Sequence, residues 1–451
     1  MWPDHVTVWR WHFYAGLLCI PFVLWLAATG SIYLFKPQID AWLDLPYENL
    51  ELRGPAQSPS AQVSAALAAV PGAVLSQYQL PQDANSAAQV LVSQGVELKR
   101  VYVHPTTLQV LQVLDEDSRF TNQILHLHGE LMAGDRGSMI VETAASWTIV
   151  MLMTGLYLWW PKGASGLAGV VYPRLQQNGR LFWRDVHAVT GFWVSFFALF
   201  LLISGLPWAK SWGGLLKDVR HLGSTATVRQ DWTAGRSSEL EQRRLNSMVP
   251  DEHAGHHHSG VAASPADETL TLPDYHALDA LVPLVRAANL QPPVLIAPPS
   301  RANTTWTAKS DTQNRPLRAE LTLGGDPAVI IARRDFSQRP LLDRVIGFGI
   351  AAHEGQLFAP LNQLLGLFTA ASLWLVCISA AVMWWRRRPI GVLGAPMVGA
   401  RTSLSIGVIA LIVLLGIVLP LYGVTLLVVW GLEQTLLRRW AAARSFLGLS
   451  R

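Results

Sequence analysis

The sequence predicts an α-helical integral membrane protein with two small extramembrane domains of mixed α and β structure. Of its 451 residues, 51% are hydrophobic and only 15% are charged, and its mean hydropathy is positive, a balance that is unusual for soluble domains. Runs of about 18 or more residues with few charges are long enough to cross a bilayer as helices. Four such runs and a longer fifth one lie at about 12–35, 140–160, 187–208, 360–385 and 403–431.

The segments between these runs indicate the topology. Two long stretches, 36–125 and 209–345, have the polar residues, prolines and glycines of soluble domains. The short connections are basic, with Lys162, Arg174, Arg180 and Arg184 in one and Arg386, Arg387, Arg388 and Arg401 in the other. Because cytoplasmic loops carry an excess of Lys and Arg, we expect the connections in the cytoplasm and the long stretches in the periplasm of a bacterial inner-membrane protein.

The first apolar run is expected to be an uncleaved spanning helix. It extends for about 23 residues and continues into 35–37 without a clear small-residue cleavage site. Cys19 and Cys377 are the only cysteines and lie within predicted spans, so no disulfide framework is expected. The net charge of +4 follows from the loop arginines and does not indicate nucleic-acid binding.

Several landmarks occur twice in the same order, which predicts two copies of one unit. Each copy has Arg and His followed by Gly at a helix mouth, then a span, an extramembrane domain, a His-containing turn and a returning span that ends in paired Trp. The landmarks are Arg10, His12, Gly16, LHLHGELMAG at 125–134 and WWPKG at 159–163, then Arg184, His187, Gly191, AAHEGQLFAP at 351–360 and WWRRRP at 384–389. Two spans per copy predict parallel repeats, related by an axis along the membrane normal.

Each extramembrane stretch is predicted to hold one helix on a small antiparallel sheet. Helical patterns open the stretches at 58–70 and 272–285, with Ser58 or Ser60 and Asp274 as candidate N-caps. Alternating, strand-like segments follow at 87–93, 98–114 and 318–334.

These features resemble one known family. WRWHFYAG at 9–16, FKPQID at 35–40, GLPWAKSWG at 205–213, HEGQLFAP at 353–360 and the paired Trp endings closely resemble the PepSY-associated transmembrane family, over residues 9 to about 430. The resemblance implies small α+β PepSY domains at about 58–115 and 272–335. It also implies a function, because members include inner-membrane haem proteins that act as ferric-siderophore reductases, among them ferrioxamine reductases.

Four histidines are candidate haem-iron ligands, because ionisable side chains in or near a bilayer are costly and usually functional. We expect His12 and His187 toward the cytoplasm, and His128 and His353 toward the periplasm. Two b-type haems with bis-His ligation are expected, since no CxxCH motif is present and such ligation suits electron transfer. We expect pairing by depth, and pairing within one repeat is the competing arrangement. His126 is a rival of His128, and since the two point about 200° apart on a helix, only one should face the bundle.

Neighbouring residues complete the candidate site. Gly16 and Gly191 lie one helical turn beyond the first histidine of each copy, where a flat macrocycle needs a wall free of side chains. Arg10 and Arg184 are candidate partners for haem propionates, because a guanidinium forks onto a carboxylate. The alternative is that these arginines hold lipid phosphates and that His12 and its counterpart are polar rings at the water interface.

Two segments keep open interpretations. DEHAGHHHSG at 251–260 could hold a transition metal through neutral imidazoles, although its Ser, Gly and Ala content favours a flexible linker. The fifth run would be about 45 Å long as one helix, longer than a bilayer core of about 30 Å. Pro420 and Gly423 therefore favour a kink or a broken hairpin, and only the hairpin returns the basic tail to the cytoplasm.

The predicted boundaries follow from these patterns. They are 9–35 for the first span, 36–125 for the first extramembrane domain, 126–160 for the first His-containing turn and second span, 161–183 for a cytoplasmic loop, 184–208 for the third span, 209–345 for the second extramembrane domain, 346–385 for the second turn and fourth span, 386–402 for a loop, 403–431 for the fifth span or hairpin, and 432–451 for the tail.

The leading hypothesis for function is an inner-membrane haem b oxidoreductase, a ferric-chelate reductase embedded in membrane lipid. A cytoplasmic or quinol donor would supply electrons, and a ferric siderophore or other ferric chelate in the periplasm would be reduced to release Fe(II) for iron uptake. No Walker motif, HExxH or GxGxxG after a strand is found, so no nucleotide site is predicted. The alternatives are a non-enzymatic PepSY module that binds a partner or senses a signal, and a proton-coupled transporter, which parallel repeats suit.

Overall fold

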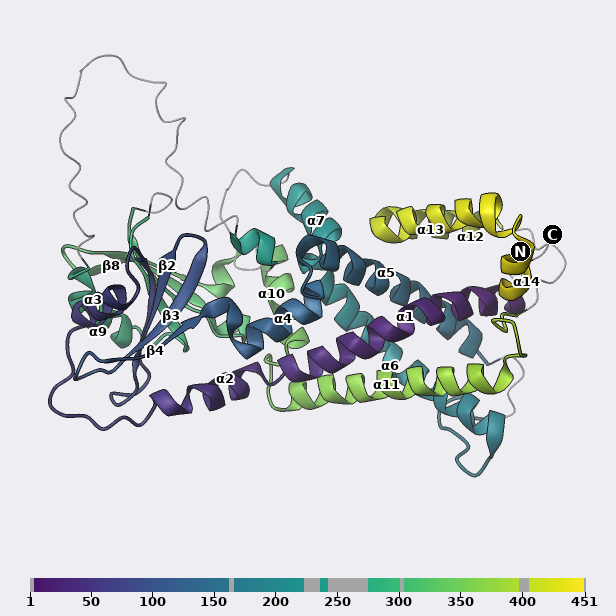
Figure 1. Cartoon of the computed structure of the whole chain (residues 1–451), viewed down its shortest axis with the longest axis horizontal. Coiled ribbons are helices and arrows are strands. Elements are labelled where there is room, and N and C mark those ends of the chain that lie inside the picture. Colours follow the sequence, from purple (N-terminus) through teal and green to yellow (C-terminus); the bar gives the residue numbers. More distant parts are fainter. Residues whose placement is uncertain are drawn as a thin grey trace, which may run out of the picture. The chain divides into compact units, whose positions relative to one another are not determined.

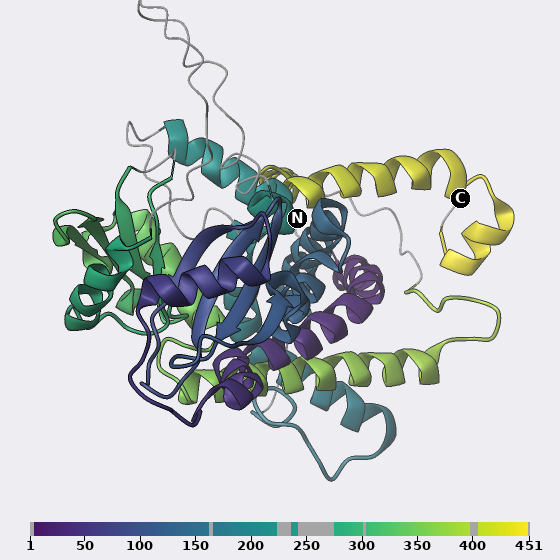
Figure 2. The ribbon, with the colours of Figure 1, turned by 60° about the vertical axis from the view of Figure 1, so that its left-hand side comes forward.

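The computed structural model of the chain describes residues 4–161, 166–222, 236–241, 275–300, 304–396 and 405–449. They form two compact units, each assembled from segments far apart in the sequence (Figure 1 and Figure 2). The helical unit comprises Met1–Phe35, Ile124–Arg236 and Ala352–Arg451, and the sheet unit comprises Lys36–Gln123 and Ser237–Ala351. Both predicted copies therefore contribute to both units.

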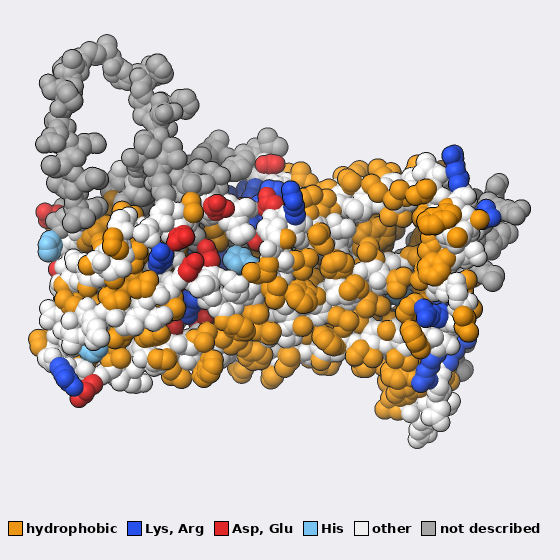
Figure 3. All heavy atoms as spheres, viewed as in Figure 1, with side chains coloured by type: hydrophobic (Ala, Val, Ile, Leu, Met, Phe, Trp, Pro, Cys, Tyr) orange, Lys and Arg blue, Asp and Glu red, His pale blue; other side chains and the backbone are white. Residues whose placement is uncertain are grey.

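Five helices of the described residues are long and apolar enough to cross a membrane, so the chain is a multi-pass membrane protein. They are α1 (His5–Tyr33), α5 (Gly134–Trp159), α6 (Gly179–Gly205) extended by the η3 turn (Leu206–Trp208), α11 (Leu361–Arg387), and α13 (Pro420–Leu432) extended by η7 (Glu433–Leu437). Figure 3 shows hydrophobic side chains covering the helical unit. Large apolar side chains such as Phe196 and Ile203 are exposed there, which is the surface that a lipid-facing helix needs.

Four of these helices form a bundle with alternating copies. α1 packs against α5 and α11, and α6 packs against the same two helices, so α1 and α6 occupy opposite corners. A short helix precedes each returning span: α4 (Phe120–Glu130) before α5, and α10 (Leu341–His353) before α11. Each short helix carries candidate histidines near its C-terminal end, which delivers them to the start of a bundle helix.

The fifth apolar run is divided into two helices that form a hairpin. α12 (Ile406–Val418) and α13 meet at Leu419, and a Cβ at Gly423 would lie 2.6 Å from the carbonyl oxygen of Gly416. Only a chain that folds back tightly, with glycine at the crossing, permits this approach. The chain before the hairpin also meets the chain after it, because the Leu393 backbone N–H donates to the Phe446 carbonyl at 2.9 Å.

One boundary differs from the sequence prediction. Residues 209–236 were expected in the second extramembrane domain, but they cluster with the helical unit, where α7 (Lys210–Leu222) packs against α5 and α13. The buried carboxylate of Glu142 accepts hydrogen bonds from the backbone N–H groups of Ser211 and Trp212, at 2.7 and 3.0 Å. A carboxylate at a helix N-terminus satisfies amides that have no partner within the helix, and so attaches α7 to α5.

The sheet unit contains one antiparallel sheet of eight strands in the order β4-β3-β2-β1-β5-β6-β7-β8. The first copy supplies β1 (Val74–Gln79), β2 (Ala88–Gln94), β3 (Glu97–Val103) and β4 (Val110–Asp115), and the second supplies β5 (Val294–Ala297), β6 (Trp306–Ser310), β7 (Ala319–Gly324) and β8 (Val329–Asp335). The remaining elements of this unit are α2 (Lys36–Asp44), α3 (Pro59–Ala69), α9 (Ala277–Ala287) and the short turns η1 (Leu45–Tyr47), η2 (Glu116–Ser118), η5 (Arg315–Leu317) and η6 (Phe336–Gln338); α14 (Ala441–Leu447) belongs to the helical unit. As predicted, Ser58 is the N-cap of α3, whereas Asp274 lies outside the described residues.

The expectation of two separate domains is wrong, because the two half-sheets join into one. β1 pairs with β5 through Tyr78 opposite Ile296, and α3 and α9 pack together over a shared hydrophobic core. Asp279 on α9 accepts hydrogen bonds from the backbone and side chain of Ser60 on α3, at 2.8 and 2.7 Å. The physical reason is that an open sheet edge leaves backbone groups unpaired, and pairing β1 with β5 removes one such edge from each copy.

Candidate functional site

The first pair of candidate histidines meets across the bundle. His12 on α1 and His187 on α6 have ring centroids 6.3 Å apart, with an interplanar angle of 78°. Nδ1 of His12 lies 3.1 Å from the carbonyl oxygen of Met151 on α5. Nδ1 of His187 lies 3.0 Å from the carbonyl oxygen of Val376 on α11. The structure thus brings together the two histidines that were expected at one depth.

The second pair lies where α4 and α10 reach the bundle. Nδ1 of His128 lies 2.9 Å from Oγ1 of Thr29, and Nδ1 of His353 lies 2.9 Å from Oγ of Ser204. Burial lowers the pKa of both imidazoles to about 4, and the proximity of His128 contributes to the lowering at His353. Both rings are therefore neutral near pH 7, the form in which imidazole binds a metal.

All four imidazoles are held in the same way. Each Nδ1 lies within 3.3 Å of a hydroxyl group, and each imidazole also has a backbone carbonyl partner three residues earlier on the same helix. The pairs of residues that supply them are Met151 and Thr154 for His12, Val376 and Ser379 for His187, Leu26 and Thr29 for His128, and Leu201 and Ser204 for His353. The carbonyl oxygens at Nδ1 of His12 and His187 only accept. The hydroxyl groups of Thr29 and Ser204 already donate to carbonyls of their own helices and so accept from the other two rings. Nδ1 therefore carries the proton and Nε2 keeps its lone pair, which is how proteins prepare a histidine for a metal.

The spacing of the first pair fits two ligands of one iron. Two metal–nitrogen bonds of about 2 Å and two ring radii of about 1.1 Å place the centroids of opposed imidazoles about 6.2 Å apart, against the 6.3 Å that separates His12 and His187. The residues present therefore fit a flat group ligated from both sides.

The glycines that face the rings are mostly not the predicted ones. A Cβ at Gly155 would lie 3.0 Å from Cε1 of His12, one at Gly30 would lie 3.2 Å from Cε1 of His128, and one at Gly205 would lie 3.4 Å from Cε1 of His353. A Cβ at Gly16 would lie 3.7 Å from the sulfur of Met151, and one at Gly191 would have no atom of the described residues within 4 Å. Neither glycine faces a ring, and the role of both as a wall for the macrocycle stays a prediction. The missed signal is a short pattern, TG at 29–30 and 154–155 and SG at 204–205, with SA at 379–380 in the fourth place.

The two candidate arginines differ in their surroundings. When His12 is aligned with His187, Arg10 corresponds to Asp185 and not to Arg184, so the two arginines are one position out of register. Arg10 donates to the carbonyl oxygens of Pro396 and Gly448, at 2.7 and 3.0 Å. Arg184 donates to the buried carboxylate of Asp185 at 2.7 Å. Their shared role as propionate partners stays a prediction, and the duplication no longer supports it.

Asp185, which had no predicted role, holds the loop before α6. Its carboxylate is fully buried and accepts two hydrogen bonds from the guanidinium of Arg174, at 2.6 and 2.9 Å. A bidentate arginine–carboxylate pair is among the stronger ion pairs in proteins. It therefore holds the loop before α6 against that helix at a position two residues before His187.

The structure bears on His126, the rival of His128, but not on the His-rich segment 251–260. His126 pairs with the buried Glu130, with Nδ1 3.6 Å from Oε2, whereas His128 on the same helix contacts the bundle through Thr29. The structure therefore places His128 in the repeated arrangement, and His126 stays a prediction without that support. The segment 251–260 lies outside the described residues.

Comparison with known proteins adds one match. The model of the family described as the PepSY-associated TM region matches residues 9–387. No curated protein matches the chain.

Proposed function

The chain belongs to the family of the PepSY-associated TM region, and on that premise we propose that it is an inner-membrane haem b oxidoreductase that reduces a ferric chelate. The observation that carries the proposal is the fourfold arrangement at Nδ1, which leaves Nε2 of each candidate histidine ready for a metal. A binding module has no need for four such rings in two pairs.

The proposal assigns two b-type haems to the four histidines. His12 and His187 would hold one, and His128 and His353 the other. Haem held by these histidines would supply one-electron redox chemistry. The task of the chain is to hold each imidazole in one tautomer and to keep water and side chains from the ring faces.

The proposal also assigns direction. The basic residues near His12 and His187, such as Arg174 and Arg387, would face the cytoplasm, where a soluble or quinol donor delivers electrons. His128 and His353 would then lie toward the periplasm, where a ferric siderophore or other ferric chelate accepts an electron. Iron(II) binds the hard oxygens of such chelators far more weakly than iron(III), so reduction releases the metal for uptake.

Visible spectroscopy of the purified protein tests the cofactor. We expect a Soret band, an α-band after reduction with dithionite, and two haems per chain by pyridine haemochrome analysis. A protein that inserts and folds but shows no such bands would refute the haem proposal.

Reduction of a chelate tests the activity. The dithionite-reduced protein, freed of reductant, should be reoxidised by ferric ferrioxamine while a colorimetric Fe(II) chelator reports the product. The gallium complex has the same shape and charge but no accessible reduction, and serves as the control. Reoxidation at the same rate by both complexes would exclude ferric-chelate reduction and leave a haem protein of another function.

A further inference from the structure

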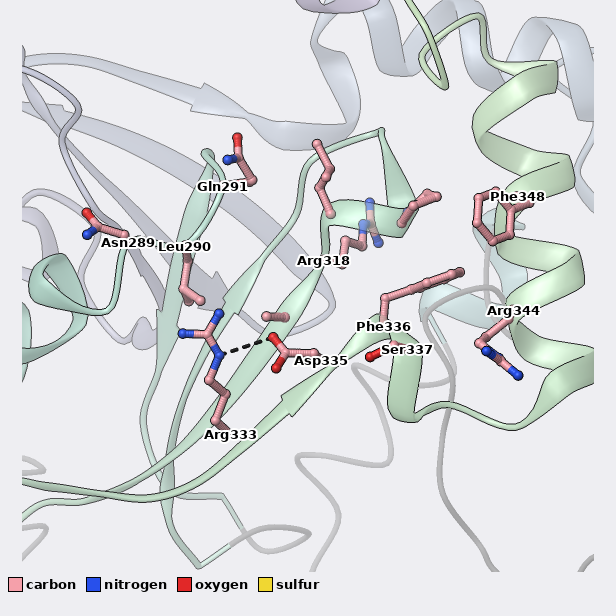
Figure 4. Close-up of a pocket in the computed structure, with 13 residues that line it drawn as sticks. Asn289, Leu290, Gln291, Arg318, Arg333, Asp335, Phe336, Ser337, Arg344 and Phe348 are labelled. Atoms are coloured by element: carbon pink, nitrogen blue, oxygen red, sulfur yellow. Dashed lines mark hydrogen bonds and ion pairs between the residues drawn. The ribbon is translucent and has the colours of Figure 1, made fainter.

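A cavity of about 450 Å³ lies within the second half of the sheet unit. Its walls come from the turn after α9, the start of β7, the end of β8 with η6, and one face of α10 (Figure 4). This volume is within the range of about 300–1,000 Å³ that small-molecule sites occupy. The cavity is separate in sequence and chemistry from the four histidines.

One wall of the cavity is aromatic, formed by the buried Phe336 and the exposed Phe348. Phe336 is 5% exposed, and its ring meets the Phe348 ring edge to face at 5.5 Å. A Cβ at Gly347 would lie 2.6 Å from the Phe336 ring, so glycine allows α10 to pack closely against it. A preformed apolar wall of this kind suits an apolar or aromatic ligand body.

The cavity also has three arginines, and two of them have partners within the protein. Arg333 donates to Asp335 at 3.1 Å (Figure 4), and Arg318 donates to the carbonyl oxygen of Thr312 at 2.6 Å. The guanidinium of Arg344 has no hydrogen bond or ion pair to any described residue, and its Nε is shielded from solvent. Because Arg344 lines the cavity and has no acceptor among the described residues, its terminal guanidinium nitrogens are available to pair with an anion there.

The corresponding place in the first copy has an internal carboxylate. The turn after β4 places Glu116 against Arg100, with bonds of 2.7 and 2.9 Å. The same turn after β8 places Phe336 in that position. The second copy therefore presents an apolar ring where the first copy presents a negative charge.

We infer that this cavity binds a small organic monoanion, with its carboxylate or equivalent group at Arg344 and its apolar body against Phe336 and Phe348. A guanidinium matches a carboxylate through two parallel hydrogen bonds. Arg333 already pairs with Asp335 and Arg318 with Asp311, so one anionic group is enough. This site does not depend on the proposed haem function.

Benzoate is the probe for this site, and benzamide is its uncharged counterpart. We expect saturable benzoate binding to the full-length protein in detergent, measured by saturation-transfer NMR, with benzamide at least tenfold weaker. Arg344→Gln should weaken benzoate at least tenfold and leave benzamide unchanged. Arg334→Gln removes an equal charge from β8 next to Arg333, at a residue that does not line the cavity. This control variant should leave the binding of benzoate and of benzamide unchanged.

A second variant tests the apolar wall. Phe348→Ala should weaken benzoate severalfold without any change in charge, and each variant should keep the circular dichroism of the parent. Three results would overturn the inference. They are no saturable benzoate binding to the parent protein, an equal loss of benzoate binding in Arg344→Gln and Arg334→Gln, and displacement of bound benzoate by inorganic phosphate as effectively as by added benzoate. The last result would indicate a general anion site without recognition of the apolar body.

Discussion

The two copies of the repeat are nearly equivalent in the helical bundle and different in the sheet. In the bundle, His12 and His187 have the same carbonyl and hydroxyl partners at almost the same distances. In the sheet, the turn after the last strand of each half places Glu116 on Arg100 in one copy and Phe336 against α10 in the other. The comparison indicates that the bundle retains the geometry of a shared centre, while the two half-sheets have diverged in what this turn contacts.

Substitution of the candidate histidines should have the largest effect, which is on the haem content of the bundle. Pairing by depth predicts that the double variant His12→Ala and His187→Ala keeps one haem, whereas His12→Ala with His128→Ala loses both. Pairing within one repeat predicts the reverse, and haem content per folded chain distinguishes them. His276→Ala, at an exposed position of the sheet unit, is the control and should keep both haems.

The sheet should respond to pH in one copy only. Burial raises the pKa of Glu116, but the hydrogen bonds and charge of Arg100 outweigh this and lower the pKa below its ordinary value of 4.5. The ion pair therefore stabilises the fold above about pH 4.5, and this stabilisation is lost as the pH falls through the lower folded pKa. The protection factors of the β3 and β4 amides in the intact protein, which correct the exchange rates for their intrinsic pH dependence, should fall in this acidic range, whereas those of β7 and β8 should not.

Glu116→Gln should remove that acid dependence. We expect a loss of about 2–3 kcal/mol in the local opening free energy near neutral pH, because a buried arginine loses its charged partner. Glu51→Gln, in an exposed pair with Arg53, should change little. An unchanged exchange rate in β3 and β4 of Glu116→Gln would show that the half-sheets do not differ in this way.

The hydroxyl groups should affect cofactor affinity more modestly. Thr29→Val removes an Oγ1 that lies 2.9 Å from Nδ1 of His128, and loss of such a partner costs about 10–100-fold in metal affinity. We expect faster haem loss to apomyoglobin and a shifted midpoint potential at that pair alone. Ser31→Ala is the matched control, because that hydroxyl bonds the Ala27 carbonyl on the same helix. Equal changes in both variants would contradict a positioning role for Thr29.

The smallest expected effect is at a glycine. Gly155→Ala would place a methyl 3.0 Å from the His12 ring, so the ring must move by a few tenths of an ångström. We expect both haems to remain and the electron paramagnetic resonance signal of one to shift. Gly214→Ala on α7, where a Cβ meets no described atom within 4 Å, should leave the spectrum unchanged and bounds the effect of the substitution itself.

Much of the fold could be predicted because its signals are local. Uncharged apolar runs determine which segments cross a membrane, and the order of repeated landmarks shows the duplication. β1, β5 and β6 were missed, because short strands in a shared core show little alternation. The TG and SG pairs were also missed, since a small residue after a hydroxyl is common in spanning helices and acquires meaning only beside a particular ring.

The sequence by itself determined the family, the membrane class and the four candidate histidines, since these depend on composition and on residue order. Tertiary structure alone decided that His12 meets His187, that the half-sheets join at β1 and β5, and that the fifth run folds back on itself. It also decided that the guanidinium of Arg344 has no acceptor among the described residues, while Asp185 has two arginines. These outcomes depend on which distant surfaces meet, and packing between helices or strands far apart in the chain has no local signature.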